Sequence, residues 1–117
     1  MLNICNKTGN ISIDSDVFTY FAGEAVTGCF GVKGMVACAK EGGAWQLLRR
    51  EAMAKGVIVH YDDDNDSISL DLHIGVDRSV NISAVCRSII KETSYKLENA
   101  TGIKVKAVNV FVDTIID

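Results

Sequence analysis

The sequence predicts a single α+β domain, a two-layer sandwich in which about three helices pack mainly on one face of a mixed β-sheet. The strongest signal is a C-terminal β-α-β unit. Apolar residues alternate over Ser67–Val76, follow helical spacing over Asn81–Ala100, and run almost continuously over Ile103–Val112. A right-handed crossover would place the two strands parallel. Turn residues are Gly, Asn and Asp, because the chain has no proline.

Length and charge limit the protein class. The 117 residues suit one domain spanning positions 1–117, with 48% hydrophobic residues to build its core. A net charge of −3 disfavours nucleic acid and anionic membrane surfaces as partners. The N-terminal residues show no secretory signal, and no stretch approaches the roughly 20 apolar residues of a membrane span. We therefore expect a cytoplasmic protein, and the four cysteines, which form no C-x-x-C pair, are expected to be buried reduced thiols.

The first half of the chain predicts a strand at Gly9–Asp14 and then a helix that ends near Gly28. Asp14 or Ser15 offers the N-cap oxygen of this helix. The glycine-rich stretch that follows carries one apolar segment, Val32–Ala39, which suits a short strand or an extended crossing.

A third helix is predicted for Ala44–Lys55. Trp45, Leu48 and Ala52 lie at helical spacing, and Gly56 suits the position just after the last turn.

An antiparallel hairpin is predicted next, because a short polar loop joins the strand Val57–Tyr61 to the strand that begins at Ser67. The loop, Asp62–Asp66, lacks the Gly and the distal Glu of a calcium loop, so we interpret it as a solvated turn. Asn81 is the expected N-cap of the last helix, and Gly102 its end. The predicted core comprises Ile13, Phe18, Phe21, Leu70, Leu72, Ile74, Val85, Ile89, Val108 and Val110.

No group of residues in the sequence specifies a reaction. The glycines at 28, 31 and 34 lack the Gly-Lys-Ser/Thr of a phosphate loop. His60 and His73 lie on paired strands and, with Asp71, could suggest a metal site. The register of the strands is not known from the sequence, however, and no third ligand is fixed, so histidines exposed on the sheet face are the preferred interpretation. Cys86 lies on the apolar stripe of a helix with no base nearby. The sequence thus predicts a protein that is not an enzyme and that binds neither a cofactor nor a metal.

Six residues form the candidate interaction surface. Ser69, Asp71 and His73 point to the polar side of the strand whose other side is apolar, and that side is expected to be wet or covered by a partner. Lys33, Met35 and Trp45 lie in or beside the glycine-rich stretch. For Met35 and Trp45, core packing is the first interpretation and a partner groove the second.

Six segments together resemble the alkaline shock protein family of Gram-positive bacteria, a group with a cell envelope-related function. They are Gly9–Ile13, Gly31–Met35, Lys55–Val59, Leu70–Ile74, Thr101–Gly102 and Val108–Val112. The resemblance covers nearly the whole chain, and Phe30 departs from it where the family commonly has proline. It implies a non-enzymatic cytoplasmic protein of the envelope and alkaline stress response. Its expected partners are itself, a membrane anchor protein, or a dihydroxyacetone-kinase-like fatty-acid kinase, so it would reach the membrane only through a partner.

An alternative is RNA binding of the KH kind. Gly31-Val32-Lys33-Gly34 has the G-x-x-G form of the loop that clamps a nucleotide backbone in KH domains. The predicted order of strands and helices is also similar. The negative net charge and the single base in the loop, Lys33, disfavour this alternative.

Overall fold

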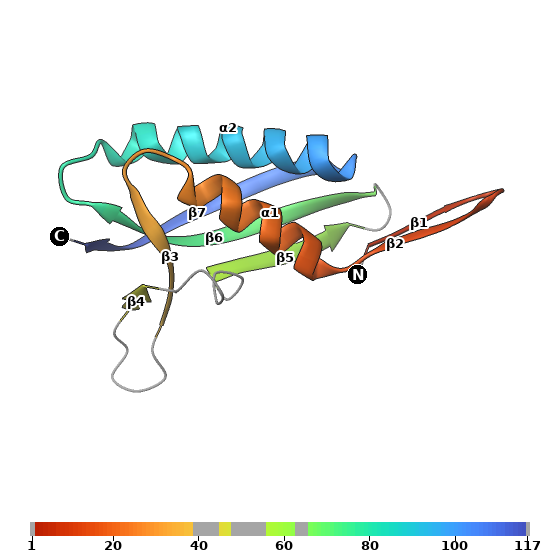
Figure 1. Ribbon diagram of the computed structural model, residues 1–117, viewed down its shortest axis with the longest axis horizontal. Coiled ribbons are helices and arrows are strands. Elements are labelled where there is room, and N and C mark those ends of the chain that lie inside the picture. The colour runs from red at the N-terminus through yellow and green to blue at the C-terminus, as the bar shows by residue number, and fades with distance from the viewer. Residues whose placement is uncertain (1, 39–44, 48–55, 63–65, 117) are drawn as a thin grey trace.

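The central strand of the fold is β6 (Ser67–Asp77). The computed structural model describes residues 2–38, 45–47, 56–62 and 66–116. Along one edge of β6, β7 (Lys104–Ile116) runs parallel for the full length of the strand, and α2 (Ile82–Thr101) is the crossover between them (Figure 1). The predicted β-α-β unit is therefore confirmed.

The other edge of β6 is shared by two antiparallel strands. Its first half pairs with β5 (Val57–Asp62), as the predicted hairpin requires, and its last residues pair with β3 (Val32–Cys38). A further short strand, β4 (Trp45–Leu47), continues the sheet beyond β3. The sheet is mixed, as the sequence predicts.

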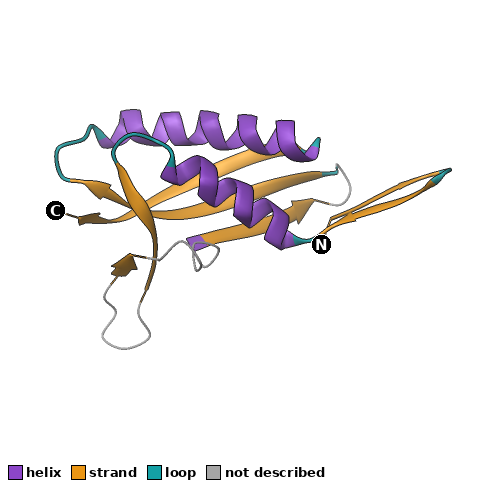
Figure 2. Cartoon of the chain, viewed as in Figure 1, coloured by secondary structure: helices purple, strands orange, loops and turns teal. Residues whose placement is uncertain are grey.

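Both described helices, α1 (Ser15–Thr27) and α2, cover the same face of the sheet (Figure 2). Their ends lie where the sequence predicts them. The Asp14 carboxylate accepts a hydrogen bond from the Ser15 N–H, and the Asn81 side chain accepts one from the Ala84 N–H. Gly102 ends α2 in the left-handed conformation, with φ 73°, and its N–H donates to the Glu98 carbonyl.

The core lies between the helices and the side of β6 that carries Leu70, Leu72 and Ile74. Seven of the predicted core residues are buried: Phe18, Leu70, Leu72, Ile74, Val85, Ile89 and Val108. The other three pack against this core while partly buried: Ile13, Phe21 and Val110.

The predicted third helix is wrong at its start. Trp45–Leu47 forms β4, with Leu47 opposite Val36 and Trp45 opposite Cys38. Backbone pairing with β3 satisfies donors and acceptors that a helix would otherwise satisfy internally, so tertiary context overrides helix propensity here. The rest of the predicted helix, residues 48–55, lies outside the described residues. The described chain therefore has two helices rather than about three.

An antiparallel ribbon precedes α1 and projects from one end of the body (Figure 1). It consists of β1 (Leu2–Asn6), which the sequence pattern does not predict, and β2 (Gly9–Ile13), which it does. A side chain at the tip organises the turn, because the Asn6 Oδ1 accepts from the N–H groups of Thr8 and Gly9, both at 2.9 Å.

Candidate interaction surface

The face of the sheet opposite the helices is lined by alternate residues of β5, β6 and β7. We call it the open sheet face. The residues of this face are Ile58, His60, Ser69, Asp71, His73, Asn109, Phe111 and Asp113. Because successive strand residues point to opposite sides, the burial of Leu70, Leu72 and Ile74 in the core places their neighbours on this face. The three β6 residues predicted for an interaction surface therefore lie together.

Asp71 is the centre of a hydrogen-bond network that crosses three strands. Its Oδ2 lies 2.8 Å from the His60 Nε2, and its Oδ1 accepts from the Asn109 amide at 3.0 Å. A carboxylate can only accept, so His60 carries its proton on Nε2 in this contact. The hydrogen bond from Asn109, then that from His60, holds the pKa of the Asp71 carboxyl below its ordinary value. The network thus keeps a fixed negative charge on the open sheet face.

His73 is held in a second polar contact on the same face. Its Nδ1 lies 2.7 Å from the Asp113 Oδ2, and its ring stacks on Phe111 with centroids 4.9 Å apart and planes 14° from parallel. Asp113 occurs where the β6–β7 register shifts, because Val112 lies opposite Ile74 while Thr114 lies opposite Gly75. The extra residue of this bulge carries the carboxylate that binds His73.

The open sheet face combines these fixed polar groups with exposed apolar ones. Ile58 on β5 and Phe111 on β7 are 46% and 44% exposed. An ordered polar network beside exposed apolar side chains is typical of surfaces that bind proteins.

Among the residues that the structure describes, no nucleophilic site is assembled on this face. Ser69 lies opposite His60 in the strand register, and His60 contacts Asp71, so three suitable residue types are neighbours. Activation of a serine requires a hydrogen bond between its hydroxyl and the base, and among the described contacts the Ser69 hydroxyl makes none to the His60 imidazole. Nor do the histidines converge on a metal position: among the described residues, no group of three or more His, Cys, Asp and Glu side chains could hold one.

The remaining predicted surface residues lie apart from the open sheet face. Lys33 is partly exposed, and its ammonium lies 3.5 Å from the Asp77 carboxylate at the end of β6. Met35 is fully buried opposite Ile74, so the structure places it in the core and not on a surface. The first interpretation of Met35, core packing, is the one that holds. Trp45 lies on β4, and its side chain is outside the described part.

Four residues of this face are absent from the surface that the sequence predicts: Ile58, Asn109, Phe111 and Asp113. A signal exists for two of them, because Asn109 and Phe111 alternate with Val108, Val110 and Val112. The almost continuous apolar character of that strand hides this alternation. The sequence singles out His60 only as a candidate metal ligand.

The G-x-x-G segment, residues 31–34, forms the turn after α1 and the start of β3. Gly31 adopts φ 88° in the turn after α1, and its carbonyl accepts from the Asp77 N–H at 3.0 Å. The remaining three residues, Val32–Gly34, belong to β3. A Cβ on Gly31 would lie 2.7 Å from a methyl carbon of Val80, so close packing and backbone conformation account for this glycine.

The described cysteines Cys5, Cys29 and Cys86 are free thiols. Cys29 and Cys86 are partly buried, whereas Cys5 on β1 is exposed, so the expectation of a buried thiol is wrong for Cys5. Cys29 Sγ lies 3.3 Å from the Ala25 carbonyl oxygen, and burial raises the pKa of both Cys29 and Cys86. Burial therefore disfavours the reactive thiolate at both positions. The side chain of Cys38 lies outside the described part.

The chain matches a family model over residues 3–116, that of the alkaline shock protein 23 family, described as having a cell envelope-related function. Two curated relatives are similar over almost their whole lengths. Spy1614 of Streptococcus pyogenes serotype M6 is 35% identical over 115 residues, covering 97% of this chain and 93% of the relative. YloU of Bacillus subtilis strain 168 is 29% identical over 112 residues, covering 95% and 92%. Both are described as uncharacterised.

Solved structures of the MamM CTD share the fold. A doubly substituted variant has a TM-score of 0.58 at 14% identity, with 90% of this chain and 98% of the other aligned. A manganese form of another variant has a TM-score of 0.51 at 15% identity, covering 86% and 99%. At this identity the likeness concerns the fold alone. Among the described helices, none is long and apolar enough to cross a bilayer.

Proposed function

Because the chain belongs to the alkaline shock protein 23 family, whose function is related to the cell envelope, we propose that it is a non-enzymatic protein–protein interaction module of the envelope and alkaline stress response. In this proposal residues 1–117 form one domain that acts in the cytoplasm. The chain associates with itself or docks on a membrane anchor protein or a dihydroxyacetone-kinase-like fatty-acid kinase, and any contact with the membrane runs through that partner.

The observation that carries the proposal is the open sheet face. The helices cover one face of the sheet, while the other presents Ile58 and Phe111 around two histidine–carboxylate contacts. Satisfied polar groups can remain in a protein interface without a penalty for unpaired charge. The two exposed apolar side chains supply surface that a partner would bury.

The test is affinity capture from cells of the native host with the full chain as bait. Ile58→Glu places a charge on the open sheet face, and Ile90→Glu places one on the exposed side of α2. Ile58 is 46% exposed and Ile90 39%, so the two variants are matched in residue type and exposure. We expect the wild type and Ile90→Glu to retain an anchor protein or a kinase, and Ile58→Glu to lose it.

Two outcomes would contradict the proposal. In one, RNA or ribosomes are recovered without an anchor or kinase, which is the result that KH-like binding would produce. In the other, Ile58→Glu and Ile90→Glu retain the same partner equally. Circular dichroism of both variants checks that a lost partner does not reflect a lost fold.

A further inference from the structure

The N-terminal arm, which we define as β1 and β2 together (Leu2–Asn6 and Gly9–Ile13) with the turn that joins them, has an apolar face that continues beyond the body. Leu2 lies opposite Ile13 and Ile4 opposite Ile11, so all four side chains share one side of the ribbon. Leu2 is fully buried, whereas Ile11 is 53% exposed. The base of the arm is thus anchored in the core, while the apolar face is increasingly uncovered toward the tip.

A two-stranded ribbon of this length is marginally stable in water without a further surface to pack on. In the described part of the chain, β1 and β2 pair only with each other, so the outer backbone edge of each strand is unpaired. Figure 1 shows the arm pointing away from the sheet and the helices. Binding to a further surface would therefore stabilise the arm, and the arm projects far enough from the body to contact another molecule.

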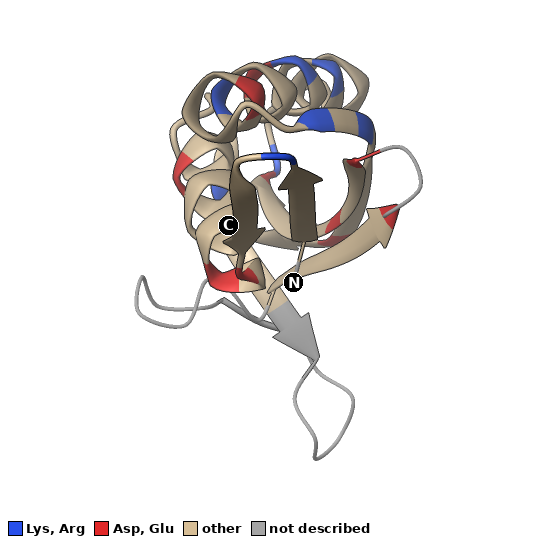
Figure 3. Ribbon diagram, turned by 90° about the vertical axis from the view of Figure 1, so that its right-hand side faces the viewer, with Lys and Arg blue, Asp and Glu red and all other residues tan. Residues whose placement is uncertain are grey.

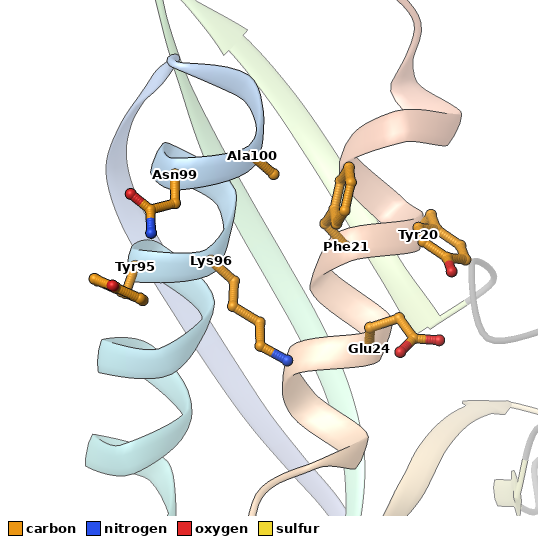
Figure 4. Close-up of a pocket in the computed structure, with 7 residues that line it drawn as sticks. All are labelled: Tyr20, Phe21, Glu24, Tyr95, Lys96, Asn99 and Ala100. Atoms are coloured by element: carbon orange, nitrogen blue, oxygen red, sulfur yellow. The ribbon is translucent and has the colours of Figure 1, made fainter.

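A groove of suitable chemistry lies between α1 and α2 (Figure 4). Its volume is about 420 Å³, and seven residues of the two helices line it: Tyr20, Phe21, Glu24, Tyr95, Lys96, Asn99 and Ala100. Tyr20 is 58% exposed and Tyr95 is 64% exposed. A shallow groove with aromatic walls is the kind of surface that accepts isoleucine side chains.

The arm and the groove lie at the same end of the molecule. The arm leads directly into α1. The ring of Phe18 on α1 packs edge-on against the ring of Tyr61 on β5, with centroids 6.3 Å apart. Tyr61 pairs with Ile68, which pairs with Val105, just beyond the end of α2. Because both features are at one end, a two-fold axis there can bring each arm to the other copy's groove in the same way.

The distribution of charge supports the arm of a second copy as the occupant of the groove. Lys7, at the tip, carries the only charged side chain of the arm. The charged residues of α1 are Asp16 and Glu24, both acidic, and Asp14 caps the helix. The end-on view in Figure 3 shows both the basic tip of the arm and the acidic start of α1 at this end of the molecule. The basic tip of the arm is thus complementary in charge to α1, whereas the α2 wall of the groove carries the basic Lys96.

We propose that two copies of this chain exchange their N-terminal arms, with Ile4 and Ile11 of one copy seated in the α1–α2 groove of the other. The inference rests on the self-association included in the proposed function. In each complex Lys7 lies against the acidic α1 of the partner copy. The open sheet face remains available to a different protein.

The test measures the mass of the full chain by light scattering and sedimentation over a range of concentrations. We expect a dimer whose dissociation constant rises about tenfold or more in Ile11→Glu, as for a buried anchor of an interface. Ile115→Glu is the control, because Ile115 is also 53% exposed but lies near the end of β7.

A charge exchange tests the groove without disturbing the apolar contacts. Lys7→Glu should weaken the dimer, and Lys7→Glu combined with Glu24→Lys should restore it, with the effect shrinking as salt is added. Circular dichroism checks the fold of each variant.

A dimer that neither Ile11→Glu nor Lys7→Glu weakens would overturn arm exchange, although self-association through another surface would survive. A wild-type chain that stays monomeric at all concentrations would also overturn it. In both cases the affinity capture with Ile58→Glu still decides the proposed function separately.

Discussion

At the scale of single residues, the open sheet face is organised by two carboxylates that each contact one histidine. Asp71 binds His60 and Asn109, and Asp113 binds His73. These contacts join residues of different strands, and Phe111 stacks on the imidazole of His73. In the proposed interaction, these contacts hold the side chains in place before a partner binds, which lowers the entropy lost on binding.

Asp71→Asn should change how stability depends on pH. The pKa of Asp71 is below its ordinary value of 3.8 in the folded protein. Its contribution to the free energy of unfolding is therefore complete above that value and is lost as the pH falls through the folded pKa. Urea unfolding between about pH 6 and pH 2 should show a smaller acid loss in Asp71→Asn than in the wild type. Parallel curves would contradict this expectation.

Asn109→Ala tests the principal cause of that pKa shift. The Asn109 amide makes the larger contribution, so its removal should raise the pKa of Asp71 toward the ordinary value. A titration of the Asp71 carboxyl carbon by NMR measures the change. Serine at position 69 offers a control, because Ser69→Ala removes a neighbouring hydroxyl that is not part of the network.

Thr93→Val should stabilise the protein. Thr93 is fully buried on α2, and its hydroxyl has no hydrogen-bond partner among the described residues. Valine has the same shape without the unpaired polar group, so we expect a gain of about 1 kcal/mol in chemical unfolding. Thr101→Val is the control and should destabilise, because the Thr101 hydroxyl donates to the Leu97 carbonyl at 2.6 Å and accepts from the Ile103 N–H. Equal effects of the two changes would contradict this assignment.

At the scale of elements, the boundaries of the helices are set locally and the irregularities of the strands are not. Asp14, Asn81 and Gly102 act within one turn of the helix ends that they define. The two register shifts between β6 and β7 depend on both strands at once. These bulges, with Lys104 and Lys106, also make the outer edge of β7 a poor template for pairing with another chain.

Two glycines at element ends should differ in their cost of replacement. Gly102 has φ 73° with open space around its Cα, so Gly102→Ala should cost about 1 kcal/mol through backbone strain alone. Gly31 has φ 88°, and an added Cβ would lie 2.7 Å from Val80 Cγ1 and 3.1 Å from Val85 Cγ2. Gly31→Ala should therefore cost about 2 kcal/mol or more, since it adds a steric clash to similar strain. Thermal unfolding of both variants measures the difference, and a smaller loss at Gly31 would contradict the packing argument.

At the scale of the whole molecule, β6 holds the fold together. It pairs with β5 and β3 on one edge and β7 on the other, and its inward side chains meet both helices. A defect in β6 therefore disturbs both the pairing of the sheet and its packing against the helices. The arm, in contrast, is anchored by Leu2 and Ile13 and leaves the open sheet face uncovered.

Leu72→Ala should show this central position. Leu72 is fully buried, so its truncation leaves a cavity and should cost about 3 kcal/mol. Ile58→Ala on the neighbouring strand is the control, and it should cost less than about 1 kcal/mol because that side chain is 46% exposed on the open sheet face. Urea unfolding measures both, and similar losses would mean that β6 is not the centre of the core.

Residue order alone was sufficient to predict the features that depend on neighbouring residues: the helix caps, the β5–β6 hairpin, the β-α-β unit and the family. Folding in three dimensions was needed to establish that Trp45–Leu47 is a strand, that Met35 is buried, and that Asn109 and Asp113 meet Asp71 and His73. The physical reason is the range of the interactions. Caps and hydrophobic periods act within a few residues, whereas strand partners and bulges depend on residues far apart in the chain, whose pairing energy outweighs local preference.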